Sequence, residues 1–87
     1  MLSFEDFKTW LTEQDGNVRF SPVNVCNCPI AKYASARLGQ PCMAAYDEIW
    51  PMDGPPILRD DWIFKVISVV DENNLRPLSA KEVLALI

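Results

Sequence analysis

Three cysteines stand close enough along the chain to suggest metal or thiol chemistry. Cys26 and Cys28 are separated by one residue, and Cys42 follows later in the sequence. Three thiolates and one carboxylate, from Asp47 or Asp53, could complete a tetrahedral zinc site. However, structural zinc sites usually use Cys-x₂-Cys pairs, and the sequence offers no histidine as a further ligand. The alternative is that the cysteines are small hydrophobic residues that only pack in the core, so we predict no bound cofactor.

Cys28 is a second candidate for chemistry because it lies at the expected start of a helix. Backbone amides and the helix dipole lower the pKa of a thiol there and make it more nucleophilic. Redox chemistry or modification at Cys28 would follow from this position, and a Cys28–Cys42 or Cys26–Cys42 disulfide would require oxidation. Catalysis would also need a base, and the absence of histidine excludes a Ser-His-Asp triad or a Cys-His dyad. An odd number of cysteines fits a reducing compartment.

Two carboxylate pairs, Asp47-Glu48 and Asp60-Asp61, are the third candidate. Paired carboxylates can perform acid–base catalysis when they are buried together. Residues adjacent in sequence point in different directions on a helix or strand, so neither pair converges by itself. Solvated acids and a helix cap explain both pairs. The sequence also lacks a Gly-rich phosphate loop and a serine nucleophile elbow, so we expect that the protein is not an enzyme.

The negative charge of the chain is concentrated in one segment. The formal net charge is −4, and between Gln40 and Asp61 there are five acids and one base. The remaining sequence is balanced, with seven acids and seven bases. A nucleic-acid-binding protein would show the opposite sign. The segment therefore favours a partner with a basic surface, or it is a solvated loop region without a partner.

Large apolar side chains lie within and beside this acidic segment. Tyr46, Trp50 and Met52 flank or enter its Pro-rich loop, and Phe64 lies on the polar side of the helix that follows. Aromatic residues and Met surrounded by acids are typical of a protein-binding patch with a charged rim. The alternative is that Trp50 folds back and closes the core. The predicted partner-binding residues are Tyr46, Asp47, Glu48, Trp50, Met52, Asp53, Asp60, Asp61 and Phe64.

Four short helices are predicted from apolar residues that recur with helical spacing. They span residues 4–14, 28–38, 60–73 and 79–87. The third has the strongest core signal, although its β-branched residues leave a strand over Ile63–Val70 as the main alternative. Its apolar arc consists of Trp62, Ile63, Val66, Ile67, Val69 and Val70.

Cap residues mark the expected helix ends. Ser3 is the expected N-cap of the first helix, with Asp6 in a capping-box position. Asn27 is the expected cap of the second helix, with Pro29 in its first turn. The other expected caps and stops are Gly16, Gly39, Asp60, Asn73-Asn74 and the capping box Ser79-x-x-Glu82.

The segments between the helices predict a small β component. Val18–Phe20 alternates apolar and polar residues as a short strand does. Cys42–Tyr46 is a second candidate strand, which would pair with Val18–Phe20 in a two-stranded ribbon, although Met43–Ala45 could also be helical. Trp50–Pro56 contains three prolines and a glycine, which predicts a loop.

The segment Cys28-Pro29-Ile30-Ala31-Lys32-Tyr33, which opens a helix, is similar to one in a group of small bacterial and phage proteins. These uncharacterised proteins carry a Cys-Pro-Leu/Ile-Ala-x-aromatic segment, followed by a Trp-x-x-x-Phe/Val helix and a Leu-Ser/Thr-Ala-x-Glu-Ala/Val-Leu terminus. Trp62 and residues 78–84 match the later motifs. The resemblance covers residues 18–87, and its motifs are short and mostly structural. It implies a phage or mobile-element origin and no particular activity.

The length of 87 residues suits one domain, residues 1–87. We expect an α+β fold, mostly helical, with four short helices and a two-stranded ribbon. No apolar run approaches the roughly 20 residues of a membrane-spanning helix. Met1–Trp10 also lacks the layout of a signal peptide. These features predict a soluble, cytoplasmic protein.

The sequence thus leads to three hypotheses about function. The first is a small acidic protein-interaction module, encoded by a phage or mobile element, that modulates or inhibits a host protein complex through a basic or apolar surface. The second is a DNA mimic, such as an inhibitor of the anti-CRISPR type, in which five carboxylates stand in for phosphates: Asp47, Glu48, Asp53, Asp60 and Asp61. The third is a thiol- or zinc-dependent structural module. No membrane or direct nucleic-acid contact is expected, and a homodimer would be a competing use of an exposed apolar patch.

Overall fold

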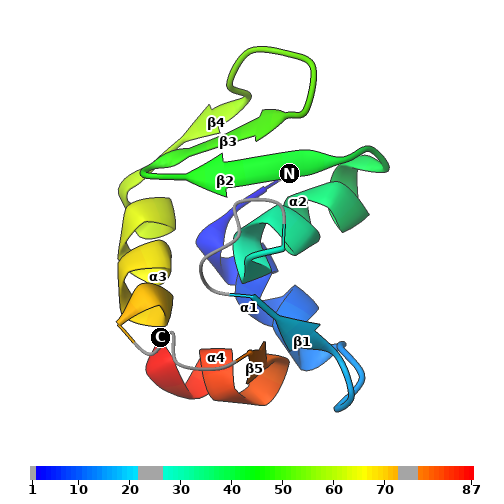
Figure 1. Ribbon diagram of the computed structural model, residues 1–87, viewed down its shortest axis with the longest axis vertical. Coiled ribbons are helices and arrows are strands. Elements are labelled where there is room, and N and C mark those ends of the chain that lie inside the picture. Colours follow the sequence, from blue (N-terminus) through cyan, green and yellow to red (C-terminus); the bar gives the residue numbers. More distant parts are fainter. Residues whose placement is uncertain (1, 22–26, 73–76) are drawn as a thin grey trace.

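The computed structural model describes residues 2–21, 27–72 and 77–87. Within these residues the chain is α+β, as the sequence predicts, with four helices and five short strands (Figure 1). In chain order they are α1 (Phe4–Thr12), β1 (Arg19–Phe20), α2 (Pro29–Leu38), β2 (Cys42–Ala45), β3 (Glu48–Pro51), β4 (Leu58–Arg59), α3 (Asp61–Asp71), β5 (Leu78–Ser79) and α4 (Ala80–Leu86).

A three-stranded antiparallel sheet, in the order β2-β3-β4, forms one end of the molecule (Figure 1). Helix α2 lies beneath β2, and α3 runs from β4 down one side to the end opposite the sheet, where α4 lies. Alternate side chains of β2 and β3 face the helices and are buried. This inner face consists of Cys42, Ala44, Ile49 and Pro51.

An aromatic cluster from three helices and β1 fills the space below the sheet. The rings of Phe7 and Trp10 on α1 contact that of Tyr33 on α2, with centroids 5.3 and 5.7 Å away. Phe20 of β1 contacts Trp10, and Trp62 of α3 contacts Phe7. On α3, the buried residues Ile63, Val66 and Val70 face this core. The helical prediction for this segment is therefore right, and the alternative strand is not formed.

The helix ends confirm some of the predicted caps. The capping box at the start of α4 is complete, because Ser79 N–H donates to Glu82 Oε1 (3.1 Å) and Glu82 N–H donates to Ser79 Oγ (3.2 Å). Gly39 ends α2 in the left-handed conformation, with φ of 69°. Asp60 occupies the N-cap position of α3, although its side chain accepts no capping hydrogen bond. The predicted stop at Asn73-Asn74 lies outside the described residues.

Two predicted caps are wrong for local reasons. The N-cap of α2 is Cys28 and not Asn27, because a residue before proline is forced into the extended conformation that an N-cap requires. Gly16 has no positive φ. Helix α1 already ends at Thr12, and the Gln14 side chain donates to Trp10 O (2.9 Å), so that carbonyl is satisfied without a left-handed glycine.

The predicted ribbon is also wrong in its pairing. Strand β1 pairs with β5, with Arg19 opposite Ser79 and Phe20 opposite Leu78. The segment after Cys42 instead forms a hairpin with β3, because a two-residue turn brings these neighbours together at little entropic cost.

Part of the predicted loop over Trp50–Pro56 also belongs to a strand. Trp50 and Pro51 are the last residues of β3. Pro51 is tolerated there because β4 pairs only with Glu48 and Ile49, so no ladder hydrogen bond requires its missing amide.

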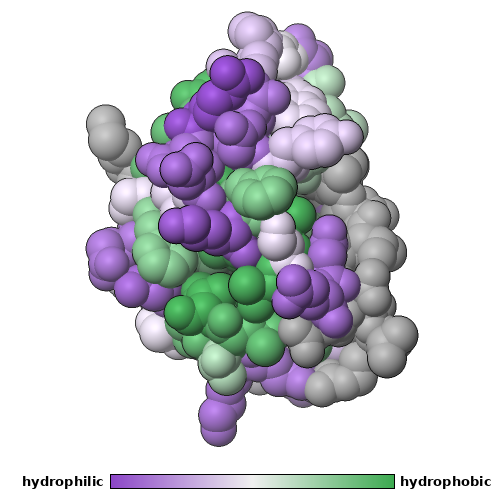
Figure 2. Space-filling model, turned by 90° about the vertical axis from the view of Figure 1, so that its left-hand side faces the viewer, coloured by the Kyte–Doolittle hydropathy of each residue, from purple (hydrophilic) through white to green (hydrophobic). Residues whose placement is uncertain are grey.

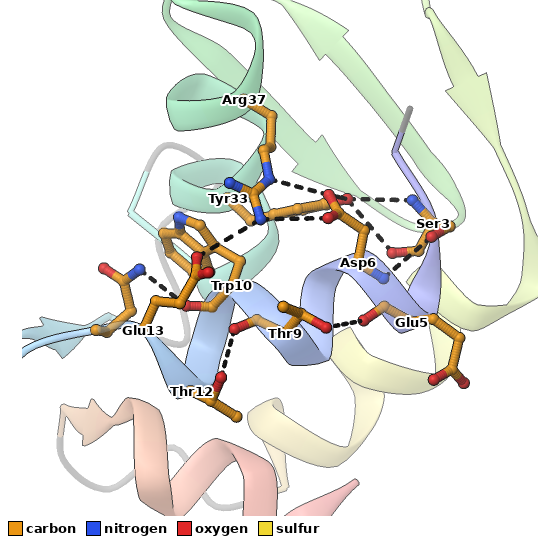
Figure 3. A network of polar contacts seen from close by, with 10 residues as sticks. Ser3, Glu5, Asp6, Thr9, Trp10, Thr12, Glu13, Tyr33 and Arg37 are labelled. Atoms are coloured by element: carbon orange, nitrogen blue, oxygen red, sulfur yellow. Dashed lines mark hydrogen bonds and ion pairs between the residues drawn. The ribbon is translucent and has the colours of Figure 1, made fainter.

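A polar network fixes α1 against α2 (Figure 3). The fully buried Tyr33 donates its hydroxyl to Asp6 Oδ2 (2.7 Å) and accepts from Ser3 N–H (3.1 Å). Arg37 binds the same carboxylate through Nε (3.0 Å) and Nη2 (3.2 Å). Ser3 Oγ caps α1 as predicted, accepting from Asp6 N–H at 3.1 Å. The Asp6 side chain does not complete a capping box, because it binds Tyr33 and Arg37 instead.

The network shifts the ionisation of its members. The hydrogen bond from Arg37, and then that from Tyr33, lower the pKa of Asp6. Burial, and next the hydrogen bond to Asp6, raise the pKa of Tyr33 to about 12. Both groups therefore hold one charge state, ionised for Asp6 and neutral for Tyr33, throughout the neutral range.

Acidic pH is predicted to weaken the polar network between α1 and α2. The pKa of Asp6 is lower in the folded than in the unfolded state. Its contribution to the free energy of unfolding is therefore present at neutral pH and is lost as the pH falls through the pKa of the folded state. Asp6→Asn should be less stable than the wild type at pH 7, and the difference should shrink as the pH falls below the ordinary Asp value of 3.8. Urea unfolding across this range measures both proteins, with the exposed Glu5→Gln as control. A difference that does not change with pH would contradict the assignment.

Candidate interaction surface

The turn between β2 and β3 places an aromatic side chain in solvent. Only Tyr46 and Asp47 connect the two strands. Among the described residues, Tyr46 is the one non-glycine residue with a positive φ, 58°. Its side chain is 75% exposed. The left-handed conformation costs a residue such as Tyr roughly 1 kcal/mol, and Gly, Asn or Asp usually occupy such positions.

Tyr46 lines a groove together with residues from α3. The groove has a volume of about 400 Å³, and its lining residues are Tyr46, Asp47, Asp61, Phe64 and Lys65. We call it the turn groove. Phe64 is 53% exposed, and the core-facing residues of α3 lie on the opposite side of the helix. The structure thus brings together four of the nine residues that the sequence selected.

Three of the other predicted residues lie apart from the turn groove. Trp50 is opposite Met43 on the outer face of the sheet, away from the helices. It is half-buried there and is not among the side chains that pack on the core, so the expectation that it closes the core is wrong. Met52, 54% exposed, and the exposed Asp53 follow in the β3–β4 loop.

The acidic segment is partly neutralised by its own base. Arg59 on β4 contacts Glu48 Oε2 through Nη2 (2.6 Å) and Asp47 Oδ1 through Nε (3.8 Å). The hydrogen bond to Glu48 raises the pKa of Arg59. Asp60 and Asp61 are exposed and form no ion pair with any described residue. The free negative charge near the turn groove therefore lies mainly at the start of α3.

The cysteines are not arranged as a metal site in the part of the chain that the structure describes. Across residues 2–21, 27–72 and 77–87, no three Cys, Asp or Glu side chains come together as ligands. Cys28 Sγ accepts a hydrogen bond from Ala31 N–H (3.4 Å) at the start of α2, and Cys42 is 2% exposed on the inner face of the sheet. Cys26, the third candidate ligand, lies outside the described residues.

Sequence reasoning missed Lys65 and the exposed Ile57. Lys65 is four residues after Asp61 and adjacent to Phe64, so helical spacing alone could have placed it at the rim of the groove. Ile57 lies between the Pro-rich loop and β4, and no sequence pattern separates it from a core residue.

Comparison with protein-family models, curated proteins and solved structures finds no match. The resemblance of residues 18–87 to small bacterial and phage proteins therefore stays a prediction. Among the described residues, the helices are too short and too polar to cross a membrane.

Cys42 is predicted to be chemically inert in the folded protein. Its thiol is buried, and burial raises its pKa, so little thiolate is accessible. Alkylation by iodoacetamide should be at least about tenfold slower in the native protein than in urea. Mass spectrometry of the tryptic peptide 38–59, which contains Cys42 alone, measures this rate. Equal rates in the two conditions would show that the thiol is open to reagents.

Proposed function

We propose that this chain is a small acidic protein-interaction module that binds a protein partner through the turn groove. The proposal depends on one observation: Tyr46 and Phe64 come from separate elements, are both largely exposed, and line the same concave surface. Exposed aromatic residues beside a groove are typical anchors of protein interfaces. The partner would insert an apolar residue between the two rings.

The backbone of the turn supports this proposal. Tyr46 occupies a position where Asn or Gly would be more stable, and its side chain has little burial to compensate. Asp47 at the next position forms the ion pair with Arg59, which holds the turn against β4. A strained, exposed tyrosine at the tip of the hairpin supports the proposal that its ring is used in binding.

The charge of the groove defines the chemistry of the partner. Asp47, Asp61 and Lys65 line it, Asp47 is paired with Arg59, and Asp60 precedes Asp61 at the start of α3. The carboxylates of Asp60 and Asp61 would attract a partner whose apolar anchor is flanked by Lys or Arg. A phage- or mobile-element-encoded modulator of a host protein complex would act in this way, by covering a functional surface of the host protein.

The DNA-mimic hypothesis receives less support from this arrangement. Two of its five carboxylates, Asp47 and Glu48, are engaged by Arg59. The other three are Asp53, Asp60 and Asp61. An apolar anchor and a charge mimic differ in their response to salt, because screening weakens exposed charge pairs and leaves apolar burial intact.

Affinity capture from a bacterial lysate at about 50 mM and 500 mM salt tests both hypotheses. The wild-type protein should retain the same complex at both salt concentrations, and Tyr46→Ala and Phe64→Ala should lose it. Leu38→Ala, which removes another large side chain that is 41% exposed, is the matched control and should retain the complex. Loss at high salt and with Asp60→Asn/Asp61→Asn would favour the mimic. Retention by both aromatic variants would overturn the proposal.

Replacing Tyr46 should separate stability from binding. Tyr46→Asn is expected to raise the unfolding free energy by about 0.5–1 kcal/mol, because Asn tolerates the left-handed conformation better than Tyr. The same variant should lose the captured complex. Urea denaturation measures the first effect, and the capture assay measures the second. A Tyr46→Asn protein that is less stable than the wild type would show that the ring contributes to folding.

A further inference from the structure

A second groove lies on the other flank of α3. It has a volume of about 440 Å³ and runs between the start of α1, α3 and the end of α4. Its apolar lining consists of Phe4, Trp62, Val66, Val69, Leu86 and Ile87. We call it the α3–α4 groove. Figure 2 looks onto the α3 side of the molecule, where hydrophobic residues gather below a more hydrophilic upper half.

One wall of the α3–α4 groove is a straight row of apolar side chains on α3. Trp62, Val66 and Val69 fall within an arc of roughly 60°, at about 100° per residue, and the row is roughly 10 Å long. The ring of Phe4 contacts that of Trp62, with centroids 5.8 Å apart. Val66 is buried, but the other apolar lining residues are only half-buried. Contiguous apolar surface that stays open in this way marks a binding site.

The walls of the groove suit a helix better than an extended peptide. An extended peptide would need a strand edge for its backbone hydrogen bonds, and every residue that lines this groove belongs to a helix or to a helix end. A helix satisfies its own backbone. Apolar anchors at positions i, i+4 and i+7 of a partner helix span roughly 10 Å, which is the length of the row on α3.

The charges along α3 define the order of charges in the occupant. Asp60 and Asp61 lie at the sheet end of the groove, and Lys65 lines it one helical turn after Asp61. All three side chains are exposed, and none forms an ion pair with a described residue. An occupant with a base at the sheet end and an acid one turn away would be complementary to this order.

We propose that the α3–α4 groove binds an amphipathic helix of a protein partner, antiparallel to α3, with Lys or Arg in its last turn. This base would lie against Asp60 and Asp61, and an acid one turn earlier would face Lys65. The antiparallel direction follows from the dipoles, because the negative C-terminal end of the partner helix would lie at the positive start of α3. Its apolar anchors would cover Trp62, Val66 and Val69.

This inference goes beyond the proposed function, because it concerns a different surface. Tyr46 and Phe64, which anchor the partner in the turn groove, do not line the α3–α4 groove. The two grooves share Asp61 and Lys65, which lie between them. Variants of the two aromatic residues therefore test the turn groove alone, and variants of the apolar row test the α3–α4 groove alone.

NMR titration of the isotope-labelled protein with a designed peptide tests the proposal. The probe is an Ala- and Gln-based helix of about 16 residues, with Leu at i, i+4 and i+7, Lys in its last turn and Glu one turn earlier. The amides of Trp62, Val66 and Val69 should shift and saturate with a Kd of about 100 μM or tighter. A peptide of the same composition, with its Leu residues spread around the helix, should bind at least about tenfold more weakly.

Protein variants separate the apolar and the charged contributions. Val69→Glu should weaken binding of the probe at least about tenfold, because it places a charge in the apolar row. Asp60→Asn/Asp61→Asn should weaken it about fivefold. The matched control Asp15→Asn/Asp53→Asn removes the same charge at exposed positions outside the groove, and should leave binding within about twofold of the wild type.

Two further variants keep this test separate from that of the turn groove. Tyr46→Ala and Phe64→Ala should bind the probe as the wild type does, and circular dichroism checks that every variant is folded. No saturable shift up to about 1 mM peptide, or equal binding of the two peptides, would overturn the proposal. Shifts of the same amides when the protein is concentrated without peptide would instead identify a second copy as the occupant, and would also overturn it.

Discussion

The hydroxyl of Tyr33 is the contact on which the arrangement of this molecule depends. It lies between the start of α1 and the middle of α2, and its ring belongs to the aromatic cluster. Two residues further along α2, Ser35 accepts a hydrogen bond from Cys42 N–H (2.9 Å) and so joins the helix to β2. One face of α2 therefore holds α1 and another holds the sheet. The aromatic cluster continues to Trp62, which sets the position of α3 under the hairpin.

The candidate surface is a consequence of this arrangement. Its two aromatic residues lie on the ends of separate elements, the β2–β3 turn and the exposed side of α3. Neither element moves easily, because the inner face of the hairpin and the opposite side of α3 are both buried. A partner would thus meet side chains that are already in place, and less conformational entropy would be lost on binding.

How much the sequence could predict depended on the distance between interacting residues. The capping box of Ser79 and Glu82 and the stop at Gly39 are local, and both were predictable. The pairing of Arg19 with Ser79, and of Asp6 with Arg37, joins distant residues that no local pattern connects. The same division applies to the site. The composition around Tyr46 and Phe64 indicated an interface, whereas only the three-dimensional structure shows that these two residues share a groove and that Trp50 does not.

The pairing of β1 with β5 has a consequence for how the chain is made. Residues 19–20 have no strand partner until residues 78–79 have been synthesised. The core residues Leu78, Ala80 and Val83 also arrive late, and α1 packs against α4. During translation the aromatic residues of α1 and β1 therefore stay partly uncovered until β5 and α4 have emerged. A chain that stops short of β5 leaves its first helix open to proteases.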